Sequence, residues 1–183
     1  MDVADFIHDL SWSDLGPAER RQVVLSLTDT LGVAAAGQGT ALPRTIRDHA
    51  AACFGGAGGK IRFDGREVSP PGAALANGMT IDAVDAHDGS KPTKGHVGCG
   101  AAAALLAAMP GADGPETLTT LAMAYEVGTR AGIALHAGAP DYHTSAPGSR
   151  SPRPRSAPGR RDWAARRRIT RSASPSITAR GAR

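Results

Sequence analysis

Aromatic residues are scarce in this 183-residue chain: Phe, Trp and Tyr make up 4% of it, although 41% of the residues are hydrophobic. A core with so few large rings has to be built mainly from Ala, Leu and Val. Such small side chains let helices approach one another closely. A chain of this length can also bury a sizeable core in one domain. The composition therefore predicts an all-α fold with a helical bundle-like domain.

Cysteines and long apolar runs are also few. Cys53 and Cys99 have no CxxC partner, so the sequence excludes a disulfide framework and favours reduced thiols in the cytoplasm. No apolar run approaches the roughly 20 residues of a membrane span. The acidic start, MDVADFIHDL, lacks the basic flank and the cleavage site of a signal peptide. We predict a soluble, cytoplasmic protein with no membrane partner.

Lysine and acidic residues are almost absent from the C-terminal segment. From Gly148 onward the chain has 11 Arg, no Lys and one acid, Asp162, which is a balance of +10. Because the whole chain carries +4, residues 1–147 carry 4 − 10 = −6. The segment is rich in Arg, Pro and Ser and has no apolar period, so residues 146–183 are predicted to be a disordered tail. Residues 1–145 form the predicted helical domain.

Two explanations account for this tail. A basic arm would bind nucleic acid through phosphate charge. Alternatively, its amino acids have codons rich in G and C, so a GC-rich gene translated out of frame would give the same composition. A frame shifted by one base, with synonymous codons chosen freely, lets residues 145–148 read Gly-Ala-Trp and residues 176–180 read Glu-Tyr-His-Gly-Pro. We favour the out-of-frame tail, so nucleic acid is not the expected partner.

Helical periods dominate the rest of the chain, because apolar residues recur three or four apart. The predicted helices include residues 3–10, 17–37, 43–54 and 116–138. The predicted apolar stripe of the second helix consists of Val24, Leu27, Leu31 and Ala34. In the third helix, Ile46 and Ala50 are predicted to face inward.

The glycine-rich segment after the third helix departs from this period. Ile61, Phe63 and Val68 alternate with polar residues around Asp64 and Gly65. Alternation is typical of a strand, and an Asp-Gly pair favours a tight hairpin turn. The sequence therefore predicts a small β-hairpin within the all-α domain.

Polar residues concentrate between two Ala-rich runs, in the segment TIDAVDAHDGSKPTKGHVGCG, residues 80–100. The preceding run has helical spacing, so Asp85 and Asp88 are predicted to share one face of that helix's last turn. The next helix is predicted to start near Val97, which places His96 at its N-terminus. If the helices pack antiparallel, the carboxylates form the floor of a cleft and His96 its wall. A solvated acidic helix end followed by a Lys-rich loop explains the same spacing.

The run ALANGMTIDAVDAHDGSKPTKGHVG resembles the signature of the MmgE/PrpD family, which includes 2-methylcitrate dehydratase, cis-aconitate decarboxylase and iminodisuccinate epimerase. The stretches LTDTLGVAAAG, AYEVGTRAGIALH and DYHTS resemble further family segments in the same order. The resemblance extends from residue 1 to about residue 145. It implies a homodimer that acts on a small carboxylate substrate by acid/base chemistry, without a metal or an organic cofactor.

The resemblance also locates the acids of the site. Asp85 matches the first acid of the family's DxDDT motif, and Asp88 matches a later one. His87 stands where the family commonly has Asp, and Gly89 stands where Thr is frequent. Thr93 is the candidate for the missing hydroxyl. These departures leave dehydration, decarboxylation and epimerisation all open as the reaction.

The family's two histidines match His96 and His143. Imidazole can exchange a proton at neutral pH, so either histidine is a candidate general acid or base, and Asp85 would orient the substrate or a histidine. The predicted catalytic residues are therefore Asp85, His96 and His143. The predicted substrate-binding residues are Asp88, Lys91, Thr93 and Lys94.

Other parts of the family's site have no counterpart in the matched segment. The resemblance places further lysines and an α+β lid domain beyond residue 145. It therefore implies that the chain is a truncated or frameshifted family member with negligible turnover by itself.

Two other classes of protein fit parts of the sequence. A helical binding module with a basic nucleic-acid-binding tail would show tight, salt-sensitive binding that disappears when residues 148–183 are removed. A metal site is the other alternative, although the candidate residues lack a recognised spacing such as HExxH, and no metal ligand is predicted. Those candidates are Asp85, His87, Asp88, His96, Cys99 and His143.

Overall fold

Six α-helices and a short antiparallel hairpin lie within residues 3–138, the part of the chain that the computed structural model describes. The helices are α1 (Val3–Asp9), α2 (Pro17–Gly37), α3 (Ala41–Cys53), α4 (Pro70–Asp82), α5 (Gly98–Ala108) and α6 (Gly114–Gly138). The smaller elements are a 3₁₀ helix η1 (Trp12–Asp14) and the strands β1 (Gly59–Lys60) and β2 (Glu67–Val68). The predicted all-α fold with a small β-hairpin is confirmed.

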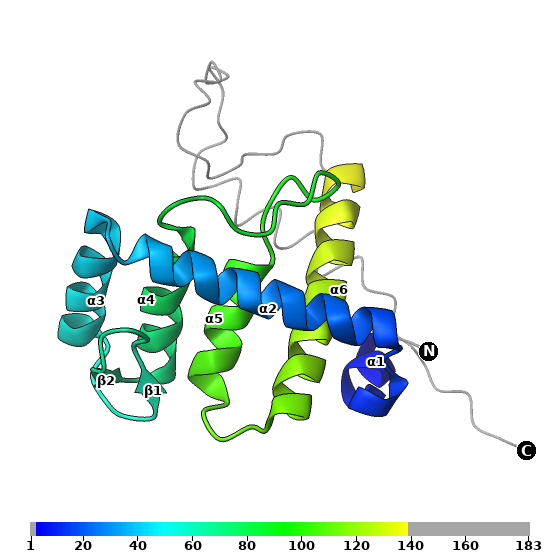
Figure 1. The fold of residues 1–183 in the computed structure, drawn as a ribbon, viewed down its shortest axis with the longest axis horizontal. Helices are drawn as coiled ribbons and strands as arrows, with labels where there is room; N and C mark the ends of the chain where they lie inside the picture. The colour runs from blue at the N-terminus through cyan, green and yellow to red at the C-terminus, as the bar shows by residue number, and fades with distance from the viewer. Residues whose placement is uncertain (1–2, 139–183) are drawn as a thin grey trace, which may run out of the picture. The chain divides into compact units, whose positions relative to one another are not determined.

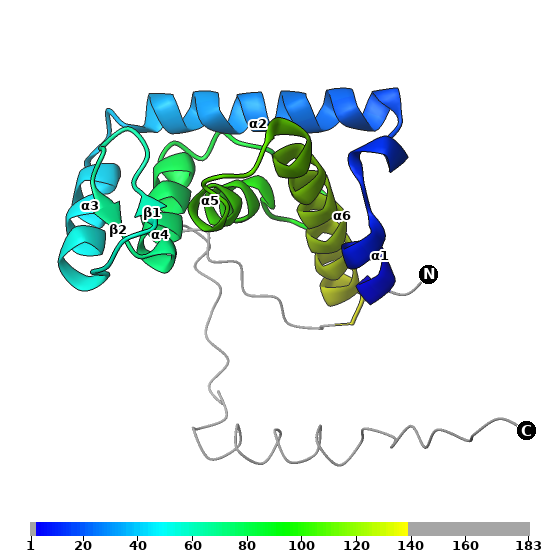
Figure 2. The same ribbon diagram turned by 90° about the horizontal axis from the view of Figure 1, so that it is seen from below.

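Helix α2 organises the fold by lying across the other helices. Figure 1 shows it passing over α4, α5 and α6, and in the view turned by 90° it runs along one side of them (Figure 2). It contacts all three of these helices, while α4 packs against α5 and α3 packs against α4. The layer formed by α3 to α6 is therefore covered on one face by a crossing helix. Among the described helices, none is long and apolar enough to cross a membrane. The predicted tail, residues 146–183, lies outside the described residues.

Proline marks the start of two of these helices. Helix α2 begins with Pro17 after Gly16, and α4 begins with Pro70 after Ser69. Proline suits the first helical position because its fixed φ is already helical and its missing N–H would have had no partner there. Glu19 adds a negative charge at the positive end of the α2 dipole. Residues local to each start therefore explain where these helices begin.

The buried face of α2 differs from the predicted stripe. Val24 and Leu31, which were predicted to face the core, are 44% and 39% exposed, so this part of the prediction is wrong. The buried residues of α2 are Val23, Thr30, Ala34 and Gly37. At its C-terminal end α2 meets the backbone of α4, because a Cβ at Gly37 would collide with the Thr80 carbonyl oxygen. Only small residues allow so close a crossing, and they decide which face of α2 is buried.

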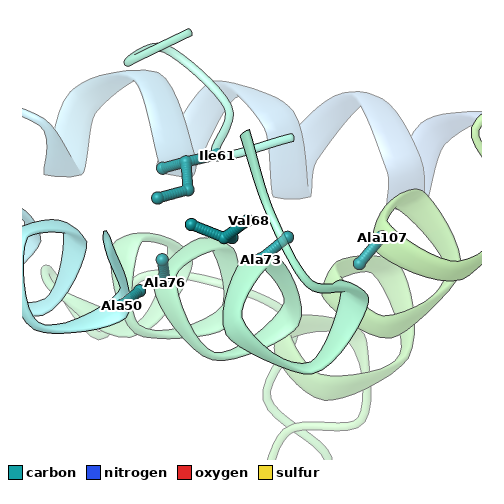
Figure 3. Packing of buried hydrophobic residues seen from close by; sticks show 6 residues of the cluster. All are labelled: Ala50, Ile61, Val68, Ala73, Ala76 and Ala107. Carbon is teal, nitrogen blue, oxygen red and sulfur yellow. The ribbon is translucent and has the colours of Figure 1, made fainter. Parts of the chain in front are cut away.

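Alanine supplies most of the core. Within residues 3–138, seven of the thirteen buried apolar residues are alanines. Figure 3 shows one cluster, in which α3, α4, α5 and the hairpin region converge. Its members are Ala50, Ile61, Val68, Ala73, Ala76 and Ala107. Because alanine contributes little side-chain area, the packing depends on helices that lie close together.

The hairpin has a wider connection than the sequence predicts. The strands pair antiparallel, but the connection is the six-residue loop 61–66 instead of a two-residue Asp-Gly turn. Gly65 does adopt a positive φ of 87°, as a turn glycine can. Ile61 and Val68 are buried, whereas Phe63 is 49% exposed. The wide loop interrupts the predicted strand alternation, and Phe63 lies in the loop with its side chain toward solvent.

Candidate functional site

Helix α4 ends before the two carboxylates that were predicted to share its last turn. Its last residue is Asp82, and the Asp85 amide donates to the Asp82 carbonyl at 3.0 Å in a turn. Asp85 has a φ of 47°, in the left-handed region that Asp tolerates better than most residues. Asp85 and Asp88 therefore lie in the loop 83–97, and their predicted common helix face is wrong.

The loop between α4 and α5 is held by its own hydrogen bonds and by α6. Ser90 and Gly95 form an isolated antiparallel bridge that closes a turn. The Thr93 hydroxyl donates to the Ser90 carbonyl at 3.1 Å, and His136 Nε2 donates to the Thr93 carbonyl at 2.7 Å. In Figure 1 the loop is seen to reach the end of α6 that carries His136. The contact with α6 thus fixes the part of the loop around Thr93.

Asp85 and His96 meet in this loop. His96 Nε2 lies 3.4 Å from Asp85 Oδ1, and His96 Nδ1 donates to the Asp88 carbonyl at 3.1 Å. A carbonyl can only accept, so the bond assigns a proton to Nδ1 and leaves Nε2 to take up or release a proton toward Asp85. The His96 side chain is 32% exposed and the Asp85 side chain is 81% exposed. The pair is therefore an oriented acid/base couple that is open to solvent.

His87 lies directly behind this couple. Its ring centroid is 4.2 Å from that of His96, and the two rings are inclined at 45°. The His87 side chain is fully buried, and within residues 3–138 neither ring nitrogen has a hydrogen-bond partner. The charged group nearest to Nε2 is Asp82, whose Oδ1 lies 3.7 Å away. From the sequence, His87 was noted as a departure from the family motif and as one of six candidate metal ligands, but its central position in the site was missed. Its place between two carboxylates, Asp85 and Asp88, was the available signal.

Cys99 lies close to His87, in the first turn of α5. Burial raises the pKa of the Cys99 thiol above its usual value, and the negative charge of Asp82 raises it further. The structure thus gathers Asp82, His87 and Cys99, three residues with metal-ligating atoms, where the last turn of α4 meets the first turn of α5.

Asp88 faces a different part of the molecule. Its Oδ2 accepts from the Gly98 amide at 3.1 Å, at the positive N-terminus of α5, while its Oδ1 is buried beside Tyr125. Asp88 also lines a pocket of about 830 Å³ between α1, α2 and α6, which contains neither Asp85 nor His96. Burial, and then the charge of Asp88, raise the pKa of Tyr125 in this pocket to about 12. Asp88 therefore separates the pocket from the acid/base couple.

The other predicted site residues are not gathered around the couple in the same way. Lys91 and Lys94 are exposed in the turn that the Ser90–Gly95 bridge closes. Thr93 is 6% exposed, and its hydroxyl is bound within the loop. His143 lies outside the described residues. Of the three predicted catalytic residues, the structure brings Asp85 and His96 together.

These observations define the class of protein: a mainly helical domain that carries a carboxylate–imidazole couple between two packed helices. The chain matches the MmgE/PrpD N-terminal domain over residues 1–150, and it belongs to the MmgE/PrpD family. No curated protein and no solved structure matches the chain.

Proposed function

We propose that this chain carries part of the acid/base site of a lyase or isomerase that acts on small di- or tricarboxylates such as 2-methylcitrate. The observation that carries the proposal is the 3.4 Å approach of His96 Nε2 to Asp85 Oδ1, in a chain of the MmgE/PrpD family. No metal or organic cofactor is needed for the proton transfers that follow.

In the proposed reaction, His96 Nε2 exchanges a proton with the substrate beside one of its carboxylates. Proton removal leaves the electron pair on carbon, where the carboxylate delocalises it. In a dehydration, the hydroxyl on the neighbouring carbon then leaves with a proton from a second acid as water. The Nδ1–H bond to the Asp88 carbonyl holds the ring in one orientation throughout, and Asp85 stabilises the imidazolium that forms.

The charges around the couple fit an anionic substrate only in part. Asp85 would repel a polycarboxylate, so cations have to bind the substrate's carboxylates. Lys91 and Lys94 are exposed in the same loop, and we propose that they bind one of the substrate's carboxylates. We further propose that His143 supplies the second acid.

We propose that turnover by the 183-residue chain is negligible. Asp85 is 81% exposed, and water at an open site weakens the electrostatic stabilisation on which proton abstraction from carbon depends. Dehydration of 2-methylcitrate by the purified chain, measured beside a full-length family member, tests this point. Comparable rates would contradict the proposal that turnover by this chain is negligible.

Binding provides the sharper test of the site itself. We expect citrate and 2-methylcitrate, but not acetate, to shift the ring resonances of His96 in NMR spectra of the full chain. Replacing His96 with Gln removes an imidazole partner at a partly exposed position, so the affinity should fall by about three- to tenfold. Asp85→Asn should change the chemical shifts of the His96 ring, because it replaces the carboxylate next to the ring.

His49 offers a matched control, because it is an exposed histidine on α3, away from the loop. His49→Gln should bind citrate as the unmodified chain does. Equal affinities in the His96 and His49 variants would show that the carboxylates bind elsewhere and would remove the support for this site.

A further inference from the structure

His87 is the least expected side chain of the domain. Its imidazole is fully buried, yet neither ring nitrogen has a hydrogen-bond partner among the described residues. A buried polar group without a partner costs roughly 1–3 kcal/mol, so such groups are rare in native interiors. The distance of 3.7 Å from His87 Nε2 to Asp82 Oδ1 is too long for a hydrogen bond. An imidazole nitrogen in this position is available to a ligand.

The side chains next to His87 are of the kind that bind transition metals. One ligand atom each from Asp82, His87 and Cys99 lie within 4.8 Å of one another. A tetrahedral zinc ion holds such oxygen, nitrogen and sulfur ligands at about 2.0–2.3 Å, so small side-chain shifts bring all three within bonding distance. Asp82 is 58% exposed, which leaves an open side for a water molecule as the fourth ligand.

We propose that Asp82, His87 and Cys99 bind one divalent transition-metal ion of the zinc type. The carboxylate, the imidazole and the thiolate occupy three positions and water occupies the fourth. As the sulfur binds the ion, the thiol proton passes to solvent. A set of one oxygen, one nitrogen and one sulfur ligand favours Zn²⁺ or Co²⁺ over Mg²⁺ and Ca²⁺, which prefer oxygen ligands.

The ion would connect the two ends of the loop that carries the acid/base couple. Asp82 is the last residue of α4, Cys99 lies in the first turn of α5, and His87 lies between them in the chain. Because the His87 ring packs on His96, fixing His87 also supports the ring of His96. The site acts on structure and takes no part in proton transfer, so it goes beyond the proposed function and does not depend on it.

A second arrangement shares His87. Asp85, His87 and His96 also bring ligand atoms within 4.8 Å of one another. Two features favour the set with Cys99. Its thiolate is a soft ligand that Zn²⁺ binds well, and Asp82 is less exposed than Asp85, with 58% against 81% of the side chain accessible. Only the set with Cys99 has a sulfur ligand, so spectroscopy can distinguish the two sets.

Titration of the metal-free full chain with Co²⁺ tests the proposal. We expect about one Co²⁺ per chain, thiolate-to-cobalt charge-transfer absorption, and the intense visible bands of a tetrahedral ion. Cys99→Ser should abolish the charge-transfer absorption. Competition with Zn²⁺ should show at least about a tenfold loss of affinity in Cys99→Ser and in Asp82→Asn, about 1.4 kcal/mol. Both positions are partly exposed, and circular dichroism checks that the variants keep their helices.

The chain offers a matched control in its other cysteine. Cys53 Sγ lies 3.5 Å from His49 Nδ1 on the exposed side of α3, so it also pairs a thiol with an imidazole, but it has no third ligand among the described residues. Cys53→Ser should leave the cobalt spectrum unchanged. The proposal is overturned if the unmodified chain shows no charge-transfer absorption, or if Cys99→Ser retains it. It is also overturned if Asp85→Asn and His96→Gln lose metal while Asp82→Asn does not.

Discussion

Tyr125 illustrates how one buried side chain can report on the state of the fold. Its hydroxyl oxygen is buried, beside the equally buried Oδ1 of Asp88. Burial and the Asp88 charge oppose ionisation, and they raise the pKa of Tyr125 from 10.0 to about 12. The folded chain therefore keeps this proton over a range in which the unfolded chain loses it.

This shift predicts a loss of stability at alkaline pH. Between about pH 10 and pH 12 the unfolded state binds fewer protons than the folded state, so the free energy of unfolding decreases as the pH rises. Below about pH 10 the contribution of Tyr125 is fully present. Tyr125→Phe should make the decrease shallower over that range and change the unfolding midpoint little at neutral pH. Urea unfolding at several pH values measures both. Identical alkaline slopes for the two chains would contradict the prediction.

At the candidate site, only the features that depend on the order of residues along the chain could be predicted from the sequence. Asp85 and His96 were predicted from the family resemblance, and in the structure Asp85 Oδ1 and His96 Nε2 lie 3.4 Å apart. His87 is different, because its importance comes from burial under His96 and from the approach of Cys99 on the next helix. Burial and contacts across helices are properties of packing, so residue spacing along the chain does not contain them.

At the scale of the elements, the bounds of α1, α2, α3 and α6 agree with the predicted ranges to within two residues, whereas the end of α4 and part of the buried face of α2 do not. Pro17 marks the start of α2 and Pro70 that of α4 by local chemistry. The end of α4 has no such marker, since no glycine or proline lies between Asp82 and Asp88. The buried face of α2 is set by its crossing over α4, which favours Ala34 and Gly37 over the bulkier residues of the predicted stripe. Hydrophobicity alone therefore placed Leu27 and Ala34 correctly in the core, but not Val24 and Leu31.

The crossing of α2 over α4 can be tested with two glycines of the same helix. A Cβ at Gly37 would collide with the carbonyl oxygen of Thr80, a backbone atom that cannot rotate away. Gly37→Ala should therefore lower the free energy of unfolding by about 1–3 kcal/mol, as overpacking does. Urea denaturation with circular dichroism detection measures the change.

Gly32 is the control, because a Cβ there would meet nothing within 4 Å. Gly32→Ala should raise the free energy of unfolding by about 0.5–1 kcal/mol, since alanine favours the helix more than glycine does. If both variants are stabilised, α2 and α4 do not approach as closely as the structure shows.

At the scale of the whole molecule, the core clusters of the described residues draw on a limited part of the chain. The residues that form them, and those packed against them, fall between Trp12 and Tyr125. Contacts along the chain likewise define a compact unit that ends at Thr144. The opposite charge balances of residues 1–147 and 148–183 agree with a change of character near this point.

Because the clusters lie within this unit, deletion of residues 145–183 should leave its stability almost unchanged. We expect the free energy of unfolding to change by less than about 0.5 kcal/mol, and hence the Tm to shift by less than about 2 °C. The urea m-value should also stay the same, because it measures the surface exposed on unfolding. Thermal and urea unfolding of the full chain and of residues 1–144, at the same salt concentration, make the comparison. A fall in Tm of more than about 8 °C would show that the deleted residues bury apolar surface of the helical unit. The core would then extend beyond α6, and both the boundary at Thr144 and the predicted tail would be wrong.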